Sequence, residues 1–499
     1  MSQHESQNTP DVTLINRREF IKKTAVGAGV VAATMAMPGF MMGNAEAVDL
    51  ANLPMKYKDY NVVFVSFDAL QAAHVGVLGN PRNVTPTIDA MAKGGFNFTN
   101  AISVASWTVP ASMTWFTGVY PSEHRLTNKF SVFNPPDHNV LSNLKKLSPE
   151  LVTLAEVLKQ NGYATGGFTG NAGVNGIFGY SQGFDEYFFE PGKFGSMSVS
   201  IPKGLEWLHK NKDKKFFMFL HGYDMHGQHV PEEGYDYRFV DKGYDKRYTG
   251  SAKEQEALRE EGLAKGTVAV RNEDVQFWRA IYDEKIQRTD ARFKKFLDEY
   301  QRMGLMDKTI FVLTSDHGTE LFEHNRIDHG FSLYNELIHV PLIIKLPGQK
   351  AGKVIRDQVS SIDVMPTILD LVDAQVPDKV KKQMRGATLV TALKGKPVDK
   401  DVFFETDYRL YTYKRGLLTK DGWKMVYTLE NKNRELYNLK TDPHETKNLV
   451  DQEPRRAYEM EQRVFAFFKS IGHDLMAKQW IPGMNPVYDS QAKQVFKQT

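Results

Sequence analysis

The chain has 499 residues, of which 41% are hydrophobic and 25% are charged, and its formal net charge is +3. These values are typical of a large globular protein, and the small net charge argues against a nucleic acid or another polyanion as a partner. The chain contains no cysteine, which excludes disulfides, thiolate metal sites and thiol nucleophiles.

The first 47 residues are predicted to be a targeting segment that is not part of the fold. Arg17-Arg18 precedes Phe-Ile-Lys, an apolar stretch covers residues 25–37, and residues 45–47 (Ala-Glu-Ala) offer a cleavage site. This order resembles a twin-arginine (Tat) signal, so we expect export to the periplasm by the Tat translocase, with the mature chain starting near Val48. A cytoplasmic protein with a chance arginine pair is the alternative.

Residues 48–375 alternate short apolar runs with amphipathic stretches, which is typical of βαβ units. Strands are predicted over 62–67, 164–168, 216–220, 310–314 and 341–344, and helices over 87–94, 153–161 and 272–303. The pattern predicts an α/β domain with a mostly parallel sheet.

Residues 376–499 have a different pattern. Three short runs, at 402–404, 422–427 and 435–439, are typical of antiparallel strands. We therefore expect a smaller, β-rich C-terminal subdomain with a tail.

Polar side chains lie at the carboxyl ends of the predicted strands, where open α/β sheets bind ligands. They are Asp68, His221, Asp224 and Asp316. Two of these carboxylates, with the imidazole of His317, suit a divalent metal ion, although an Asp at a strand end is also a common helix cap.

Thr108 lies in a Pro-flanked segment, residues 106–110, that is predicted to be a turn. A metal ion bound to its hydroxyl would lower the pKa of that group and make it a nucleophile.

Short motifs follow one another through residues 60–450. They are Val65-Ser66-Phe67-Asp68, Ser106-Trp107-Thr108-Val109-Pro110, Phe116-Thr117-Gly118, Asp224-Met225-His226, Ser315-Asp316-His317-Gly318, Glu323-His324, Asp328-His329-Gly330 and Leu333-Tyr334-Asn335-Glu336. In this order and spacing they resemble the sulfatase family of the alkaline phosphatase superfamily. The resemblance implies that family's α/β fold, in which helices sandwich the sheet. Gln71, Ala73 and Ser112 depart from its pattern, which frequently has charged residues there.

The resemblance also implies roles for single residues. Thr108 stands at the nucleophile position, where conventional sulfatases carry a cysteine that is modified to formylglycine. The implied metal ligands are Asp68, Thr108, Asp316 and His317, and the implied catalytic groups are Thr108, His226 and His329. Either histidine would hold the nonbridging oxygens or protonate the leaving group.

A second metal or substrate site is also compatible with the sequence. It would use Asp224 and His229, together with His226 and His329. His221, His229 and His324 are equally compatible with structural roles.

The absence of a formylglycine precursor favours a hydrolase of phosphate or phosphonate esters. Sulfate ester hydrolysis through Thr108 is the second interpretation, and a phosphoryl-group transferase or a catalytically inactive binding protein are further ones. The divalent metal is Ca, Mg, Mn or Zn, and neither its identity nor its number follows from the sequence. The expected substrates are small-molecule, glycan or lipid esters, and the oligomeric state is not predicted.

Overall fold

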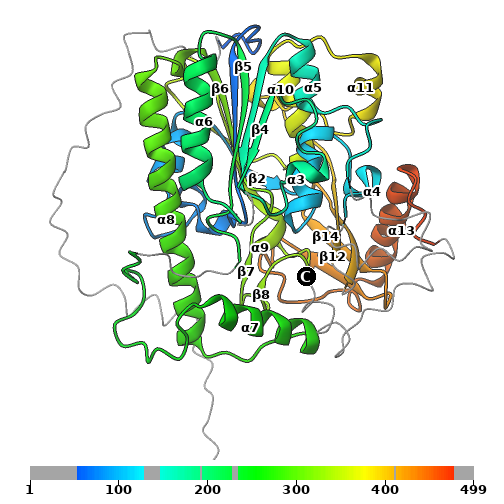
Figure 1. Cartoon of the computed structure of the whole chain (residues 1–499). Helices are drawn as coiled ribbons and strands as arrows, with labels where there is room; N and C mark the ends of the chain where they lie inside the picture. Colours follow the sequence, from blue (N-terminus) through cyan, green and yellow to red (C-terminus); the bar gives the residue numbers. More distant parts are fainter. Residues whose placement is uncertain (1–52, 128–145, 191–193, 228–233, 409–411, 477–499) are drawn as a thin grey trace, which may run out of the picture. The chain divides into compact units, whose positions relative to one another are not determined.

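The computed structural model describes residues 53–127, 146–190, 194–227, 234–408 and 412–476 (Figure 1). The predicted signal segment and His229 lie outside these ranges. None of the helices within them is long and apolar enough to cross a membrane.

A nine-stranded sheet forms the centre, in the order β10-β2-β9-β6-β1-β5-β3-β4, and β11 also pairs with β2. The strands are β1 (Asn61–Phe67), β2 (Phe96–Ile102), β3 (Ala164–Thr169), β4 (Glu186–Phe189), β5 (Phe216–Gly222), β6 (Thr309–Thr314), β9 (His339–Lys345), β10 (Lys353–Ile355) and β11 (Val359–Ser360). Only β9 runs antiparallel to its neighbours, β2 and β6. The predicted mostly parallel α/β sheet is confirmed.

Helices cover both faces of this sheet (Figure 1). The helices of this part of the chain are α2 (Pro86–Lys93), α3 (Thr108–Thr117), α4 (Pro121–His124), α5 (Leu154–Gln160), α6 (Met197–Asn211), α7 (Ala252–Lys265), α8 (Asn272–Arg302), α9 (Asn335–Ile338), α10 (Val364–Leu371), α11 (Asp378–Gln383) and α12 (Val390–Leu393).

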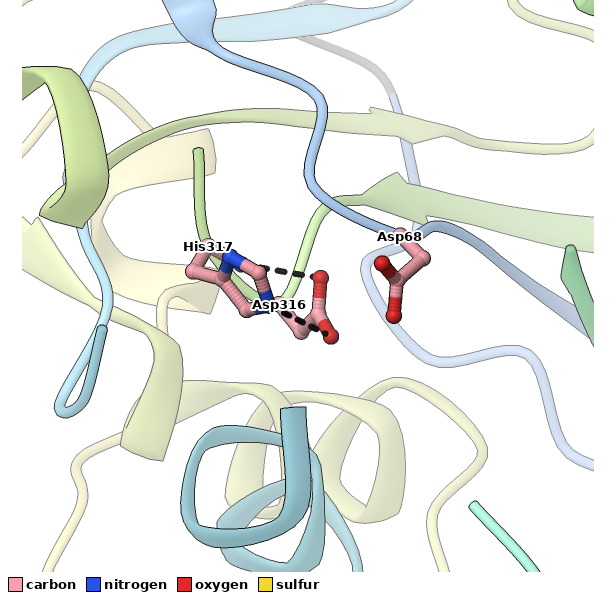
Figure 2. Close-up of side chains that lie close together, drawn as sticks. All are labelled: Asp68, Asp316 and His317. Atoms are coloured by element: carbon pink, nitrogen blue, oxygen red, sulfur yellow. Dashed lines mark hydrogen bonds and ion pairs between the residues drawn. The ribbon is translucent and has the colours of Figure 1, made fainter. Parts of the chain in front are cut away.

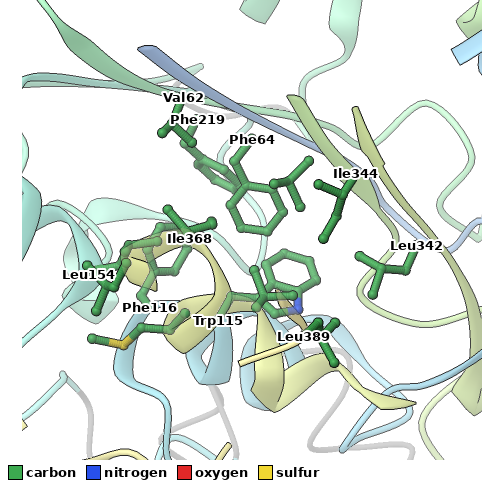
Figure 3. Packing of buried hydrophobic residues seen from close by; sticks show 14 of the residues in the cluster. Val62, Phe64, Trp115, Phe116, Leu154, Phe219, Leu342, Ile344, Ile368 and Leu389 are labelled. Carbon is green, nitrogen blue, oxygen red and sulfur yellow. The ribbon is translucent and has the colours of Figure 1, made fainter. Parts of the chain in front are cut away.

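The side chains of β1 alternate between two hydrophobic cores because successive residues of a strand point to opposite faces. Val62 and Phe64 enter the core that contains α3, where the ring centroid of Phe64 lies 5.2 Å from that of Trp115 (Figure 3). Val63 and Val65 enter the other core, with residues of α2, α6 and α8. Burial of each such side chain stabilises the fold by about 2 kcal/mol. The double burial fixes β1, and with it the position of Asp68.

A second, antiparallel sheet follows, in the order β12-β13-β14-β15. Its strands are β12 (Val402–Tyr408), β13 (Thr412–Leu418), β14 (Trp423–Thr428) and β15 (Arg434–Asn438), and α13 (Pro454–Ser470) packs on them through Val464 and Phe468. The β-rich C-terminal region is thereby confirmed, whereas its boundary near residue 375 stays a prediction. A short hairpin of β7 (Glu320–Leu321) and β8 (Ile327–Asp328) lies between the two sheets in sequence.

Candidate active site

Two neighbouring strands bring Asp68, Asp316 and His317 together. Asp68 follows β1, and Asp316 and His317 follow β6, which pairs with β1 in parallel. One ligand atom of each residue lies within 4.8 Å of the others, and all three side chains are fully buried (Figure 2). The structure therefore groups three of the predicted metal ligands.

The carboxylate of Asp316 is held by backbone donors. The backbone N–H groups of Ala69 and His317 donate to Oδ1 at 3.1 and 2.9 Å, and Ala69 adopts a left-handed φ of 57° to do so. Asp316 Oδ2 and Asp68 Oδ1 are buried and have no hydrogen-bond partner within the described residues. Such orphaned oxygens cost free energy unless an ion satisfies them.

The electrostatics also fit a divalent cation. Burial and the nearby Asp316 raise the pKa of Asp68 well above its ordinary value, so a bound cation would stabilise the charged form of this carboxyl. Burial lowers the pKa of His317, which favours the neutral imidazole that metal binding requires. Its Nδ1 lies 2.7 Å from the Gly318 carbonyl, a contact that orients Nε2 towards the site.

Thr108 lies beside this group at the start of α3. Its hydroxyl donates to Asp68 Oδ2 at 3.1 Å, and its Oγ1 lies 3.3 Å from His317 Nε2. The predicted turn is wrong, because Thr108 is the first residue of a helix. Proline is tolerated in the first turn, where its missing N–H is not needed, so Pro110 does not prevent the helix. A bound anion would meet the positive end of α3.

Gly173 packs against Thr108 from the other side. A Cβ at Gly173 would lie 2.8 Å from the Thr108 methyl carbon, so only glycine leaves room for that side chain. This contact could not be predicted from the sequence, since the two residues are far apart along the chain.

His329 and His226 extend the site outwards. The His329 ring centroid lies 4.4 Å from that of His317 and 4.8 Å from that of His226. His329 is buried, whereas His226 is partly exposed and its Nδ1 lies 2.8 Å from the Gly227 carbonyl. Three imidazoles thus connect the buried carboxylates with the surface, and both predicted catalytic histidines belong to this row.

Asp328 lies against His329, and the sequence motifs predict no role for it. Burial alone would raise the pKa of this carboxyl, but His329, Arg259 and His226 together hold it well below its usual range. The Asp-His pair in the sequence was the signal that could have identified it.

The other predicted residues have different surroundings. Asp224 accepts from the Met197 backbone N–H at 2.8 Å and forms an ion pair with Arg292, so its carboxylate has partners without a metal ion. His221 is fully buried, and its Nε2 lies 3.5 Å from Asp68 Oδ2. Burial lowers the pKa of His221 to about 4. Ser112 donates to the Thr108 carbonyl.

His324 lies in a second group with Glu336 and Glu445, whose ligand atoms also lie within 4.8 Å of one another. Lys424 Nζ is 2.6 Å from Glu445 Oε1, and His324 Nε2 is 3.3 Å from Glu336 Oε2. These ion pairs already neutralise the carboxylates, which supports the structural interpretation of His324.

Comparisons with known proteins agree with these features. Residues 60–374 match the sulfatase family, and residues 322–466 match the family described as N-sulphoglucosamine sulphohydrolase, C-terminal. Arylsulfatase K of Mus musculus is 23% identical over 452 residues, which cover 81% of this chain and 78% of that protein. N-acetylglucosamine-6-O-sulfatase of Bacteroides thetaiotaomicron is 23% identical over 517 residues, which cover 85% of this chain and 89% of that protein.

A solved structure with a different named activity has the same fold. The phosphonate monoester hydrolase of Agrobacterium radiobacter superposes with a TM-score of 0.65 at 19% identity, and the match covers 83% of this chain and 96% of that one.

Proposed function

The chain belongs to the sulfatase family, and on this premise we propose that it is an exported, metal-dependent hydrolase that cleaves phosphate or phosphonate esters with Thr108 as the nucleophile. One observation carries the proposal. The Thr108 hydroxyl lies 3.1 Å from Asp68 Oδ2 and 3.3 Å from His317 Nε2, in a chain that contains no cysteine.

The nucleophile decides between the ester classes. A formylglycine hydrate has a second hydroxyl, which lets a sulfatase expel the covalent sulfate without attack on sulfur. Thr108 has one hydroxyl, so an ester formed on it has to be cleaved by water at the central atom. Attack of water on phosphorus is ordinary chemistry for phosphorylated enzymes, and this favours phosphate and phosphonate esters.

A divalent ion held by Asp68, Asp316 and His317 would lower the pKa of the Thr108 hydroxyl and neutralise developing negative charge. The chain's own groups supply the rest. Thr108 passes its proton towards Asp68 Oδ2, with which it already forms a hydrogen bond. The start of α3 faces the anion, and the row of His329 and His226 holds its oxygens or donates a proton to the leaving group.

Sulfate ester hydrolysis is the second candidate function, and a specific observation favours it. The curated relatives reported above are named as sulfatases, and they match four fifths or more of this chain. The missing cysteine stands against it.

The deciding experiment measures kcat/KM on 4-nitrophenyl esters of phosphate, a phosphonate and sulfate, with metal content determined by elemental analysis. We expect hydrolysis of the phosphate or phosphonate ester well above that of the sulfate ester. Thr108→Ala should lower the rate by about 10³-fold or more, because it removes the nucleophile, and Thr108→Ser should keep part of it.

The matched control is Thr114→Ala in the same helix, since among the described residues the Thr114 hydroxyl donates to the Pro110 carbonyl alone. It should leave the rate almost unchanged. A phosphate adduct on the peptide that contains Thr108, trapped by acid quench, would be direct support. A clear preference for sulfate, or full activity of Thr108→Ala, would overturn the proposal.

A further inference from the structure

Asp328 has a strained backbone at the end of β8. Its φ is 90°, although it is not a glycine, and its side chain is almost completely buried. A non-glycine residue in this region costs of order 1–3 kcal/mol and persists only where its surroundings enforce it. Such strain is concentrated at functional sites.

The two oxygens of Asp328 have different partners. His329 Nδ1 lies 2.6 Å from Oδ1, and the backbone N–H of His329 donates to the same oxygen at 3.0 Å. On the other side, Arg259 Nη1 donates to Oδ2 at 3.4 Å from helix α7, which packs on β8. Gly227 packs against the same carboxylate, and a Cβ at this position would lie 2.6 Å from Asp328 Oδ1.

The 2.6 Å ion-pair contact places the Nδ1 side of the His329 ring against Asp328. With Nδ1 turned to Asp328, Nε2 is the nitrogen that remains for the substrate, on a ring that lies 4.4 Å from that of His317. His226 differs, since its Nδ1 faces a neutral carbonyl and its ring is partly exposed.

We propose that Asp328, anchored by Arg259, is a positioning residue that holds His329 Nε2 as the proton donor to the leaving oxygen, so that the substrates include esters of alkyl or sugar alcohols. This inference rests on the proposed function. A nitrophenolate leaves without help, whereas an alkoxide is too basic to leave unprotonated. A positioned proton donor is therefore needed for esters of alkyl or sugar alcohols and not for nitrophenyl esters.

The Thr108 Oγ1 to phosphorus bond forms while the bond from phosphorus to the alcohol oxygen breaks. The Thr108 hydroxyl proton passes to Asp68 Oδ2, and the proton on His329 Nε2 moves to the alcohol oxygen. His329 keeps the proton on Nδ1, which faces Asp328. In the second half, Nε2 takes a proton from the attacking water while the bond from Thr108 to phosphorus breaks. The proton held by Asp68 returns to Thr108 Oγ1, which restores the free enzyme.

The test uses the ethyl and 4-nitrophenyl esters of whichever acid the wild-type protein cleaves best, so the result does not depend on the acid. Asp328→Asn is the variant of choice, because asparagine tolerates a positive φ. It should lower kcat for the ethyl ester by about 10²-fold and for the 4-nitrophenyl ester by no more than about threefold. KM and metal content should stay unchanged, and Arg259→Gln should give a smaller effect in the same direction.

The chain offers a matched control in Asp283. Asp283 is also a buried carboxylate, but it belongs to helix α8. One of its oxygens lies 2.6 Å from His74 Nδ1, and the other lies 2.6 Å from Arg82 Nη1. Asp283→Asn should not separate the two esters. An equal fall for both esters in Asp328→Asn, loss of its metal, or an unchanged ethyl ester rate would overturn the inference alone. If the wild-type protein cleaved no phosphate, phosphonate or sulfate ester, the proposed function would fail and the inference with it.

Discussion

The two oxygens of the Asp316 carboxylate have different surroundings. Backbone N–H groups of Ala69 and His317 donate to Oδ1, whereas Oδ2 is buried without a hydrogen-bond partner among the described residues. Oδ1 therefore links the residues that follow β1 and β6, and Oδ2 can bind an ion. Asparagine at this position would keep the shape of the side chain and lose its charge.

For Asp316→Asn we therefore expect loss of bound metal and of activity together, while the fold persists. Metal affinity should fall by about 100-fold or more, since even groups that only orient a ligand are worth 10–100-fold. Elemental analysis gives the metal content, and circular dichroism reports the fold. A variant that retained a full complement of metal would remove Asp316 from the ligand set.

Asp290→Asn is the matched control for this variant. Asp290 is also buried, but its carboxylate accepts from the backbone N–H groups of Thr87 and Ile88 at the start of α2. It should lose some stability and keep its metal, because its role is to cap a helix.

At the scale of elements, α4 is attached to α3 through His124. The His124 ring is fully buried, with Nε2 3.2 Å from the Pro110 carbonyl, and the Leu126 backbone N–H donates to Nδ1 at 3.1 Å. One nitrogen has to donate and the other has to accept, so this arrangement requires the neutral ring. Burial lowers the pKa of His124 from 6.5 to about 3.

The sign of the pH dependence follows from this shift. Below pH 6.5 the unfolded chain takes up a proton at His124 and the folded chain does not, so stability falls as the pH drops from about 6.5 towards 3. His124→Gln removes this proton and should reduce the slope of unfolding free energy against pH by about 1.4 kcal/mol per pH unit. Urea unfolding at pH 4.5, 5.5 and 7.5 measures it. Equal slopes in both proteins would refute a neutral buried His124.

Individual elements show which parts of the fold could be predicted from the sequence. The run from Val62 to Phe67 predicts β1 because it is apolar on both faces, and the Asp after it predicts Asp68 at the sheet edge. Two facts could not follow from such patterns. The antiparallel course of β9 depends on its neighbours, and the contact of Arg259 with Asp328 joins residues 69 positions apart. Local periodicity carries no information on either.

At the scale of the molecule, buried polar contacts attach the C-terminal sheet to the α/β part. The backbone N–H of Ser122 donates to Glu405 Oε1 at 2.9 Å, and that of Asn335 donates to Glu445 Oε2 at 2.7 Å. Burial raises the pKa of Glu405 to about 7. Such contacts form only once both parts are folded, so they couple the folding of the C-terminal region to that of the α/β part.

The burial of the site bears on the proposed export. The site buries two carboxylates and an imidazole with 0% exposure, so an ion has to be present before the fold closes or enter it later. A translocase that carries folded proteins would allow loading before export. The Arg17-Arg18 pair, the apolar stretch over 25–37 and residues 45–47 are the sequence features that support this route.

Replacing Arg17 and Arg18 by lysine should leave the unprocessed precursor in the cytoplasm, because the route reads the arginine pair and not its charge. Cell fractionation with immunoblotting measures the distribution, and the size of the retained chain shows whether residues 1–47 are still attached. Replacing Lys22 and Lys23 by arginine is the control, since it keeps the charge and leaves the pair intact. If the lysine variant reached the periplasm as efficiently as the control, export by this route would be refuted, while the assignment of the active site would stand.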